Sequence, residues 1–384
     1  MTRRVGYLSL ATLFLAASLA ADTAWKWSGA FSDRTLSLLI IGDIQVHSRR
    51  ADPTTAFVNV RETLRAADLV YANLEGVLVE SGGSEGDIPD KKGWTHPGPG
   101  GVKALQDAGV DVVGLANNVA YGRNNILQTA RLLKGNGVVT VGVGRNLGDA
   151  HKPAIVERKG VKIGFLQYTA RWYREDEQLA TATAAGAARM TSRDGITIDA
   201  GDLARLQQDV RKLRPQVDIV VVSHHNRDGA TPVQFGLQPA RAPGAPRPDR
   251  TRPEPYQKQF AQTALDAGAD LVYGHGTHYV QGVELYKGKP IVYAVGHSAF
   301  DQPGYEDSKD GLVLRVVIDG RNILRLSIVP VSRDAQNNVM MLDPTMGEGA
   351  RLVTHVKERS TDVPLRVDGQ EVVMIDRVTQ TSRR

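Results

Sequence analysis

The run Leu-Leu-Ile-Ile-Gly-Asp at residues 38–43 decides the fold class, because four apolar residues lead directly into a glycine and a carboxylate. Five further apolar runs end in the same way at Asn, Glu or His: Leu69–Glu75, Val112–Asn118, Ile219–His225, Leu271–His278 and Val292–His297. Continuous apolar, β-branched runs of this length are typical of strands buried on both faces. In open α/β sheets, the loops that leave the carboxyl ends of such strands line the ligand cleft. We therefore expect the six polar endings to share one cleft.

Helical patterns alternate with these strands, which predicts an α/β protein. Apolar residues recur at helical spacing in four stretches: Thr54–Ala67, Asn125–Lys134, Asp202–Leu213 and Pro255–Ala267. Arg158-Lys159-Gly160 separates two strand-like runs and predicts a hairpin. The alanine- and threonine-rich tract 179–188 fits either a helix or a loop. Beyond residue 312, strand-like runs recur at 312–318, 323–330 and 372–375.

The amino terminus has the layout of an export signal. Arg3 and Arg4 precede an apolar stretch from about residue 5 to residue 19, and Ala20 and Ala21 follow it. This arrangement predicts a signal peptide over residues 1–21 and therefore a periplasmic or extracellular protein. A retained membrane anchor is the alternative, although the apolar run is shorter than the ~20 residues that a membrane span needs.

Composition limits the chemistry of any site. The 384 residues include no cysteine, so metal ligands are restricted to His, Asn and carboxylates. The net charge of +5 suits an anionic polymer as partner. Much of this charge lies in the signal region, in the Pro- and Arg-rich stretch 239–255 and at the carboxyl terminus, without a basic helix. We therefore predict no nucleic-acid binding.

The residue types at the strand ends favour a divalent metal. Carboxylate oxygens and imidazole nitrogens are suitable ligands for Zn, Mn or Fe. His224 and His225 are adjacent on one strand, so their side chains point to opposite faces and only one is expected to reach the cleft.

Five short motifs follow one another along the chain: Gly42-Asp43, Asn73-Leu74-Glu75-Gly76, Leu115-Ala116-Asn117-Asn118, Gly142-Val143-Gly144-Arg145-Asn146 and Gly274-His275-Gly276-Thr277-His278. Together they resemble the CapA/PgsA family of capsule and poly-γ-glutamate synthesis proteins, a branch of the calcineurin-like metallophosphoesterases. The resemblance covers about residues 36–302. It implies a four-layer αββα sandwich with mixed sheets and a centre holding one or two metal ions. We assign residues 34–330 to this domain and residues 331–384 to a β-rich extension of it.

The resemblance also implies roles for single residues. Asp43 matches the first metal carboxylate, and Glu75 stands at the position of the bridging carboxylate. The remaining ligand positions match Asn118, His225, His275 and His278, with His224 as a one-residue alternative to His225. Asn117 and Arg145, which lie in the matched motifs, are predicted to bind substrate.

The chain departs from the family pattern at three places. Val119 stands where the family has the histidine of Ala-Asn-Asn-His, a proton donor or phosphate binder whose loss typically costs ~10²- to 10⁴-fold in rate. His225-Asn226-Arg227 replaces His-Trp-Gly, and Gly296-His297-Ser298 replaces Gly-Asn-Phe. His297 and His47 are the candidates to take over the missing catalytic role.

These observations predict an exported, CapA-like protein with a metal-dependent hydrolase-type site. Its substrate would be a phosphoester or an anionic polymer, such as a capsule polymer or poly-γ-glutamate. The protein would act beside a membrane-bound polymer synthase complex. The alternative is a non-catalytic polymer-binding or assembly subunit that lost the family histidine at Val119. Convergence of the predicted ligands toward one point would favour the first hypothesis.

Overall fold

The computed structural model describes residues 35–46, 49, 52–79, 95–226, 249–301 and 308–378. The predicted signal peptide, His47 and most of the Pro- and Arg-rich stretch 239–255 lie outside these residues. Within the described ranges, no helix has the length and apolar character needed to cross a membrane.

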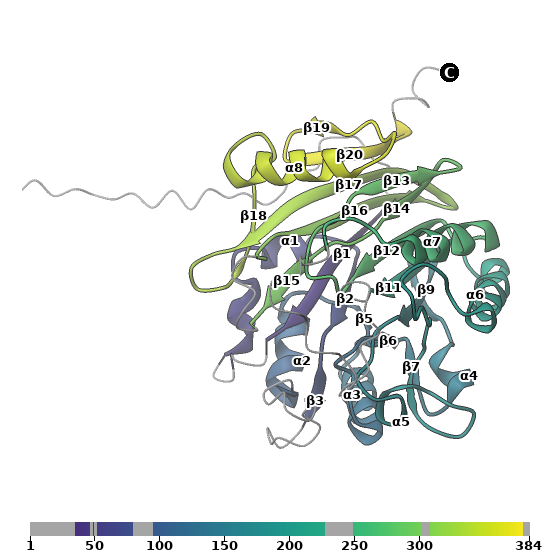
Figure 1. Cartoon of the computed structure of the whole chain (residues 1–384). Coiled ribbons are helices and arrows are strands. Elements are labelled where there is room, and N and C mark those ends of the chain that lie inside the picture. Colours follow the sequence, from purple (N-terminus) through teal and green to yellow (C-terminus); the bar gives the residue numbers. More distant parts are fainter. Residues whose placement is uncertain are drawn as a thin grey trace, which may run out of the picture.

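The larger sheet has ten strands and mixed directions (Figure 1). At its centre, β1 (Leu36–Gln45) pairs in parallel with β2 (Leu69–Leu74) and antiparallel to β16 (Gly311–Asp319). The sheet continues on one side through β5 and β6 and on the other through β17, β20 and β19, with β15 on β1 and β18 on β17. Their bounds are β5 Val112–Gly114, β6 Val139–Val141, β15 His297–Phe300, β17 Asn322–Arg333, β18 Val339–Met341, β19 Arg366–Asp368 and β20 Glu371–Asp376.

The smaller sheet has six strands, in the order β13-β14-β12-β11-β9-β8. Its strands are β8 Ala154–Arg158, β9 Val161–Thr169, β11 Ile219–His225, β12 Leu271–His275, β13 Val283–Tyr286 and β14 Lys289–Val292. The predicted hairpin joins β8 to β9. Its turn residues Lys159 and Gly160 have φ values of 50° and 77°, the positive values that a tight hairpin turn requires.

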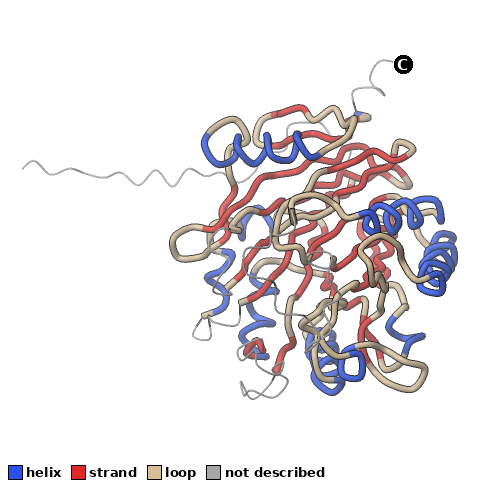
Figure 2. Tube along the Cα trace, in the orientation of Figure 1, coloured by secondary structure: helices blue, strands red, loops and turns tan. Residues whose placement is uncertain are grey.

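The two sheets pack face to face and helices cover both outer faces. Leu38, Ile40 and Tyr71 of the larger sheet share one core with Phe165 and Val221 of the smaller sheet. A second core lies under α1 (Arg61–Arg65), α2 (Gly98–Asp107) and α3 (Arg123–Gly135), and a third under α6 (Ala200–Leu213) and α7 (Pro255–Ala267). Figure 2 shows the strands between these helices. The predicted αββα arrangement with mixed sheets is confirmed.

Several local predictions need correction. The helix predicted over Thr54–Ala67 divides into a 3₁₀ turn, Pro53–Phe57, and the short α1, because this stretch is rich in β-branched and polar residues that weaken a helix. The tract 179–188 is not a helix, and its two-residue strand β10 (Gly186–Ala187) pairs with β7 (Val143–Gly144). The helix α8 (Gly347–Arg359), near β19 and β20 in Figure 1, was not predicted.

Candidate metal centre

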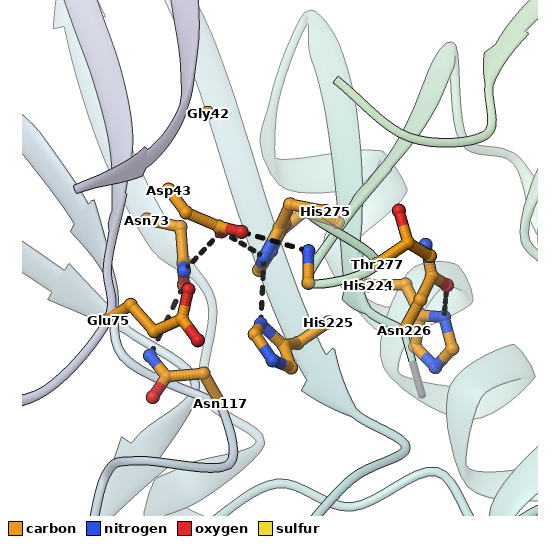
Figure 3. A network of polar contacts seen from close by, with 12 residues as sticks. Gly42, Asp43, Asn73, Glu75, Asn117, His224, His225, Asn226, His275 and Thr277 are labelled. Atoms are coloured by element: carbon orange, nitrogen blue, oxygen red, sulfur yellow. Dashed lines mark hydrogen bonds and ion pairs between the residues drawn. The ribbon is translucent and has the colours of Figure 1, made fainter. Parts of the chain in front are cut away.

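Strand pairing brings four predicted residues to one place. β15 runs parallel to β1 with Asp43 opposite His297, and β11 runs parallel to β12 with His225 opposite His275. The first pair belongs to the larger sheet and the second to the smaller sheet. Polar residues at the carboxyl ends of β1, β11 and β12 therefore meet where the two sheets come together, as Figure 3 shows for Asp43, His225 and His275. The predicted strand ending at His297 is wrong, because β14 ends at Val292 and His297 is the first residue of β15.

Asp43 lies between two pairs of histidines. One carboxylate oxygen lies 3.1 Å from Nδ1 of His275, which is 3.0 Å from Nδ1 of His225. The other oxygen lies 3.9 Å from Nδ1 of His278, which is 2.7 Å from Nε2 of His297. All five side chains are buried. Two possible donor sets share the carboxylate: Asp43, His225 and His275 form donor set 1, and Asp43, His278 and His297 form donor set 2.

A polar network fixes the orientation of the Asp43 carboxylate. The Asn73 amide donates to it at 2.8 Å and the backbone N–H of Gly276 donates at 3.1 Å (Figure 3). Gln167 donates to the Asn73 side-chain oxygen at 2.9 Å and lies 3.1 Å from Nε2 of His275. Since Gln167 belongs to β9 and Asn73 to β2, this bridge joins the two sheets beneath the site. No role was predicted for Gln167, although a polar residue near the end of an apolar strand was a visible signal.

Glu75 and Asn118 also lie at the centre. Glu75 is fully buried, 4.0 Å from Nε2 of His278. The side-chain oxygen of Asn118 lies 2.6 Å from Nε2 of His225, and its amide donates to the Tyr173 hydroxyl at 3.2 Å. All six predicted metal ligands thus lie in one buried cluster.

The structure shows which of the two adjacent histidines, His224 or His225, faces the site. His224 points to the opposite face of β11, where its ring stacks on Phe260 and its Nδ1 lies 2.7 Å from the Asn226 side-chain oxygen (Figure 3). Only His225 of this pair faces Asp43.

The two predicted substrate-binding residues lie in different surroundings, since Asn117 is buried and donates to the Asn73 side-chain oxygen at 3.4 Å whereas Arg145 is exposed (Figure 3). Asn117 donates to the Leu74 carbonyl and accepts from the backbone N–H of Val119 and Ala120, so its side chain is engaged within the protein. The Arg145 side chain is 77% exposed and pairs with Asp149 at 2.7 Å. Arg145 is therefore not brought into the buried cluster, because its loop turns to the surface before α4 (Leu147–Ala150).

His278 has an unusual backbone. Its φ is +65°, in the left-handed region that residues with a side chain seldom occupy. Such a conformation costs on the order of 1–3 kcal/mol and persists where the surroundings hold it, often at functional sites. The turn from Gly276 to His278 keeps this strained conformation, which aims the His278 ring at Asp43.

Comparison with known protein families supports the resemblance that the five ordered motifs indicate. Residues 37–233 and 247–302 match the family described as bacterial capsule synthesis protein PGA_cap. The chain belongs to this family.

Relatives of this PGA_cap family member include named capsule proteins. It is 26% identical over 307 residues to the capsule biosynthesis protein CapA of Bacillus anthracis, covering 77% of this chain and 67% of that protein. It is 25% identical over 325 residues to the PGA biosynthesis protein CapA of Bacillus subtilis, covering 80% and 76%. A protein of Mycobacterium tuberculosis named "Probable polyglutamine synthesis accessory protein" is 28% identical over 286 residues, covering 72% and 65%.

Solved structures also resemble this PGA_cap chain. A hypothetical protein from Thermus thermophilus has a TM-score of 0.45 and 17% identity over 80% of this chain and 99% of that chain. The NAD nucleotidase of Haemophilus influenzae has a TM-score of 0.39 and 12% identity over 85% and 57%.

Two departures from the family pattern are visible in this PGA_cap chain. Val119 is buried beside Asn118, so an apolar side chain fills the place of the expected histidine. His297, one of the predicted replacements, lies in donor set 2, and its Nδ1 faces the Ser308 carbonyl at 3.0 Å. Engagement of one ring nitrogen by a carbonyl orients the other toward a metal, as is usual for histidine ligands. His47, the other replacement, lies outside the described residues.

The charges in the cluster suit a cation. Burial alone would raise the pKa of Asp43, but the side-chain hydrogen bond with His275 and the electrostatic attraction of that ring outweigh it and hold this pKa far below its usual range. Burial lowers the pKa of His297 to about 3 and, with the charge of a neighbouring histidine, that of His225 and His278 well below 6.5. At neutral pH these three histidines are uncharged, which is the form that binds metals.

The metal-free protein is expected to lose stability as pH falls below about 6.5. Four buried histidines stay neutral in the folded state: His224, whose pKa is about 3, and His225, His278 and His297. Unfolded histidines take up protons near pH 6.5. Because the unfolded state binds more protons between pH 6.5 and about 3, acid favours unfolding, by about 1.4 kcal/mol per pH unit for each extra proton. Thermal unfolding between pH 7.5 and 4.5 measures the slope, and His297→Asn should flatten it. A midpoint independent of pH would contradict this expectation.

Proposed function

We propose that this protein is an exported member of the capsule synthesis family that uses a metal-dependent hydrolase-type site in the synthesis or processing of an extracellular anionic polymer. The observation that carries the proposal is the buried Asp43 carboxylate shared by two pairs of histidines from both sheets. A buried carboxylate is costly unless it is paired or binds a metal. Four histidines around it, with Glu75 and Asn118 beside them, form an oxygen and nitrogen donor set that suits Zn, Mn or Fe.

In such a site some residues would hold the metal ions and others would keep these ligands in position. His225 and His275 would hold one ion and His278 and His297 a second, with Asp43 between them. When bound, the ions would polarise a phosphoryl or acyl oxygen and lower the pKa of a bound water. Asn73 and the Gly276 backbone keep the carboxylate in position, and the Gln167 bridge keeps the two sheets, and hence the two halves of the site, in register.

Export and partnership are parts of the same proposal. The charged start, apolar stretch and small residues of the first 21 positions support secretion to the periplasm or beyond. The relatives are named for capsule biosynthesis, PGA biosynthesis and polyglutamine synthesis, and the last of them is named as an accessory protein. A place beside a membrane-bound polymer synthase fits both observations.

A second candidate function is a non-catalytic polymer-binding or assembly subunit. The observation that favours it is Val119, because its buried isopropyl group can neither donate nor accept a proton where the family has a histidine. In this case the polar cluster would serve to stabilise the fold or bind polymer without turnover.

Elemental analysis separates the two functions. The mature protein, purified without chelators, is compared with His275→Ala and with His151→Gln, a control whose ring pairs with Asp209 away from the cluster. We expect one or two metal ions per chain in wild type and in the control, near-complete loss in His275→Ala, and hydrolysis of p-nitrophenyl phosphate or a γ-glutamyl peptide only where metal is present. Metal-free wild type would overturn the hydrolase proposal. Bound metal without hydrolysis of either substrate would favour the assembly subunit.

A further inference from the structure

An arginine outside the predicted site lies beside the metal centre. Arg171 follows β9, whose last residue Thr169 is paired with His225 in register. The backbone N–H of Ala170 donates to the His225 carbonyl at 2.9 Å, and the Thr169 hydroxyl donates to the Arg171 carbonyl at 2.7 Å. The backbone of Arg171 is thus fixed at the strand end that carries His225.

Tyr173 positions the Arg171 side chain. The guanidinium carbon lies 5.7 Å from the centre of the Tyr173 ring, within the range of a cation–π contact. The ring is itself held at its far end, since the Tyr173 hydroxyl accepts from Asn118, which contacts His225. The backbone of Tyr173 is also fixed, because its N–H donates to the Gln178 side-chain oxygen at 2.6 Å. A single aromatic ring therefore separates the guanidinium from a predicted metal ligand.

Arg171 brings a largely buried positive charge next to the centre. The residue is only 8% exposed. Its guanidinium lies over the ring of Tyr173, whose hydroxyl contacts Asn118 of the centre. A cation this close to a site built for metal cations does not help to bind them. It does suit an anion that enters together with them.

Guanidinium chemistry indicates the kind of anion. Arginine presents a planar fork of N–H donors that matches a carboxylate or phosphate group, and a charge-assisted pair is roughly twice as strong as a neutral hydrogen bond. Burial strengthens such a contact further, because little water competes for the charge. The Val119 side chain supplies no hydrogen-bond donor for a substrate anion, whereas the Arg171 guanidinium supplies several.

We propose that Arg171, positioned by Tyr173, binds an oxyanion of the substrate, a phosphate or carboxylate group, next to the metal ions. This proposal rests on the proposed metal site. It assigns the substrate a negatively charged group adjacent to the bond that reacts, and it makes Arg171 a specificity-determining residue.

Anion binding to the metal-loaded, full mature chain tests the proposal. Isothermal titration with inorganic phosphate and, separately, with a γ-linked triglutamate is performed on wild type, Arg171→Gln, Arg171→Lys and Arg174→Gln. The last variant is a matched control, since Arg174 lies in the same loop but is exposed and pairs with Asp176. We expect Arg171→Gln to weaken binding by about 10- to 100-fold, Arg171→Lys to weaken it less, and Arg174→Gln to leave it unchanged.

Metal content and the thermal midpoint of every variant are measured in parallel. Equal metal in all variants with weaker anion binding in Arg171→Gln supports the proposal; loss confined to phosphate indicates a phosphoester substrate, and loss confined to triglutamate indicates a carboxylate polymer. Unchanged binding in Arg171→Gln, loss of its metal, or no anion binding by metal-loaded wild type overturns the role of Arg171 but not the proposal that the wild-type protein holds metal. Metal-free wild type would instead overturn the proposed function itself.

Discussion

Asp43→Asn is expected to remove bound metal almost completely and to lower any hydrolytic activity by more than about 100-fold. Among the residues that the structure describes, only Asp43 belongs to both donor sets. An amide keeps the shape of the side chain but loses the negative charge and one of the two anionic oxygens. Since changes to groups that merely support a ligand cost about 10- to 100-fold in metal affinity or activity, loss of the shared carboxylate should cost more.

The control for this variant is Asp209→Asn. Asp209 is a partly buried carboxylate that contacts His151 and Tyr168, away from the centre. Elemental analysis should find metal at the wild-type level in Asp209→Asn and almost none in Asp43→Asn. Circular dichroism of both variants shows whether they fold. Folded Asp43→Asn that retains both ions would show that Asp43 is not a bridging ligand.

Gly276→Ala is expected to lower both the free energy of unfolding and the metal content. Gly276 has a φ of +86°, and a methyl group on it would lie 2.7 Å from the His225 ring. The backbone strain costs about 1–2 kcal/mol, and overpacking adds typically 1–3 kcal/mol. Relief of the clash requires the His225 ring to leave the position that it holds in donor set 1. Chemical denaturation and elemental analysis measure the two effects.

Gly288→Ala is the control that separates the cost of backbone strain from the cost of steric overlap in Gly276→Ala. Gly288 has a φ of +74°, close to that of Gly276, but a methyl group there would meet no atom within 4 Å. We therefore expect a loss of about 1–2 kcal/mol in unfolding free energy and unchanged metal content. Equal metal loss in both variants, or none in Gly276→Ala, would mean that the His225 position does not control metal binding.

The sequence predicted the parts of the site that are local. Each of the predicted ligands follows an apolar run, so the sequence predicted that Asp43, Glu75, Asn118, His225, His275 and His278 lie together. Their role as metal ligands stays a prediction. The alternation of side chains along a strand predicted that only one of His224 and His225 would reach the site, and the family resemblance favoured His225. The helix α7 could be placed to the residue, because Pro255 begins it and Gly268 ends it.

Contacts between distant segments could not be predicted in this way. The Gln167 bridge to Asn73 depends on how the two sheets face one another, and no periodicity within β9 specifies its partner. The Arg171 guanidinium lies over Tyr173, whose position is set by Asn118 and Gln178. Arg145 shows the converse case, because it lies in a matched motif yet is exposed at the surface.

The pairing of β1 with β15 sets an order of events during synthesis. Gly42 donates to the Ser298 hydroxyl at 2.9 Å across 256 positions of the chain, and Asp43 lies opposite His297. A growing chain therefore exposes Asp43 long before the partners that complete its surroundings have been made. Contacts between such distant segments form slowly, since the intervening loop must close first. Binding of the proposed metal ions would therefore require chain segments as far along as His297.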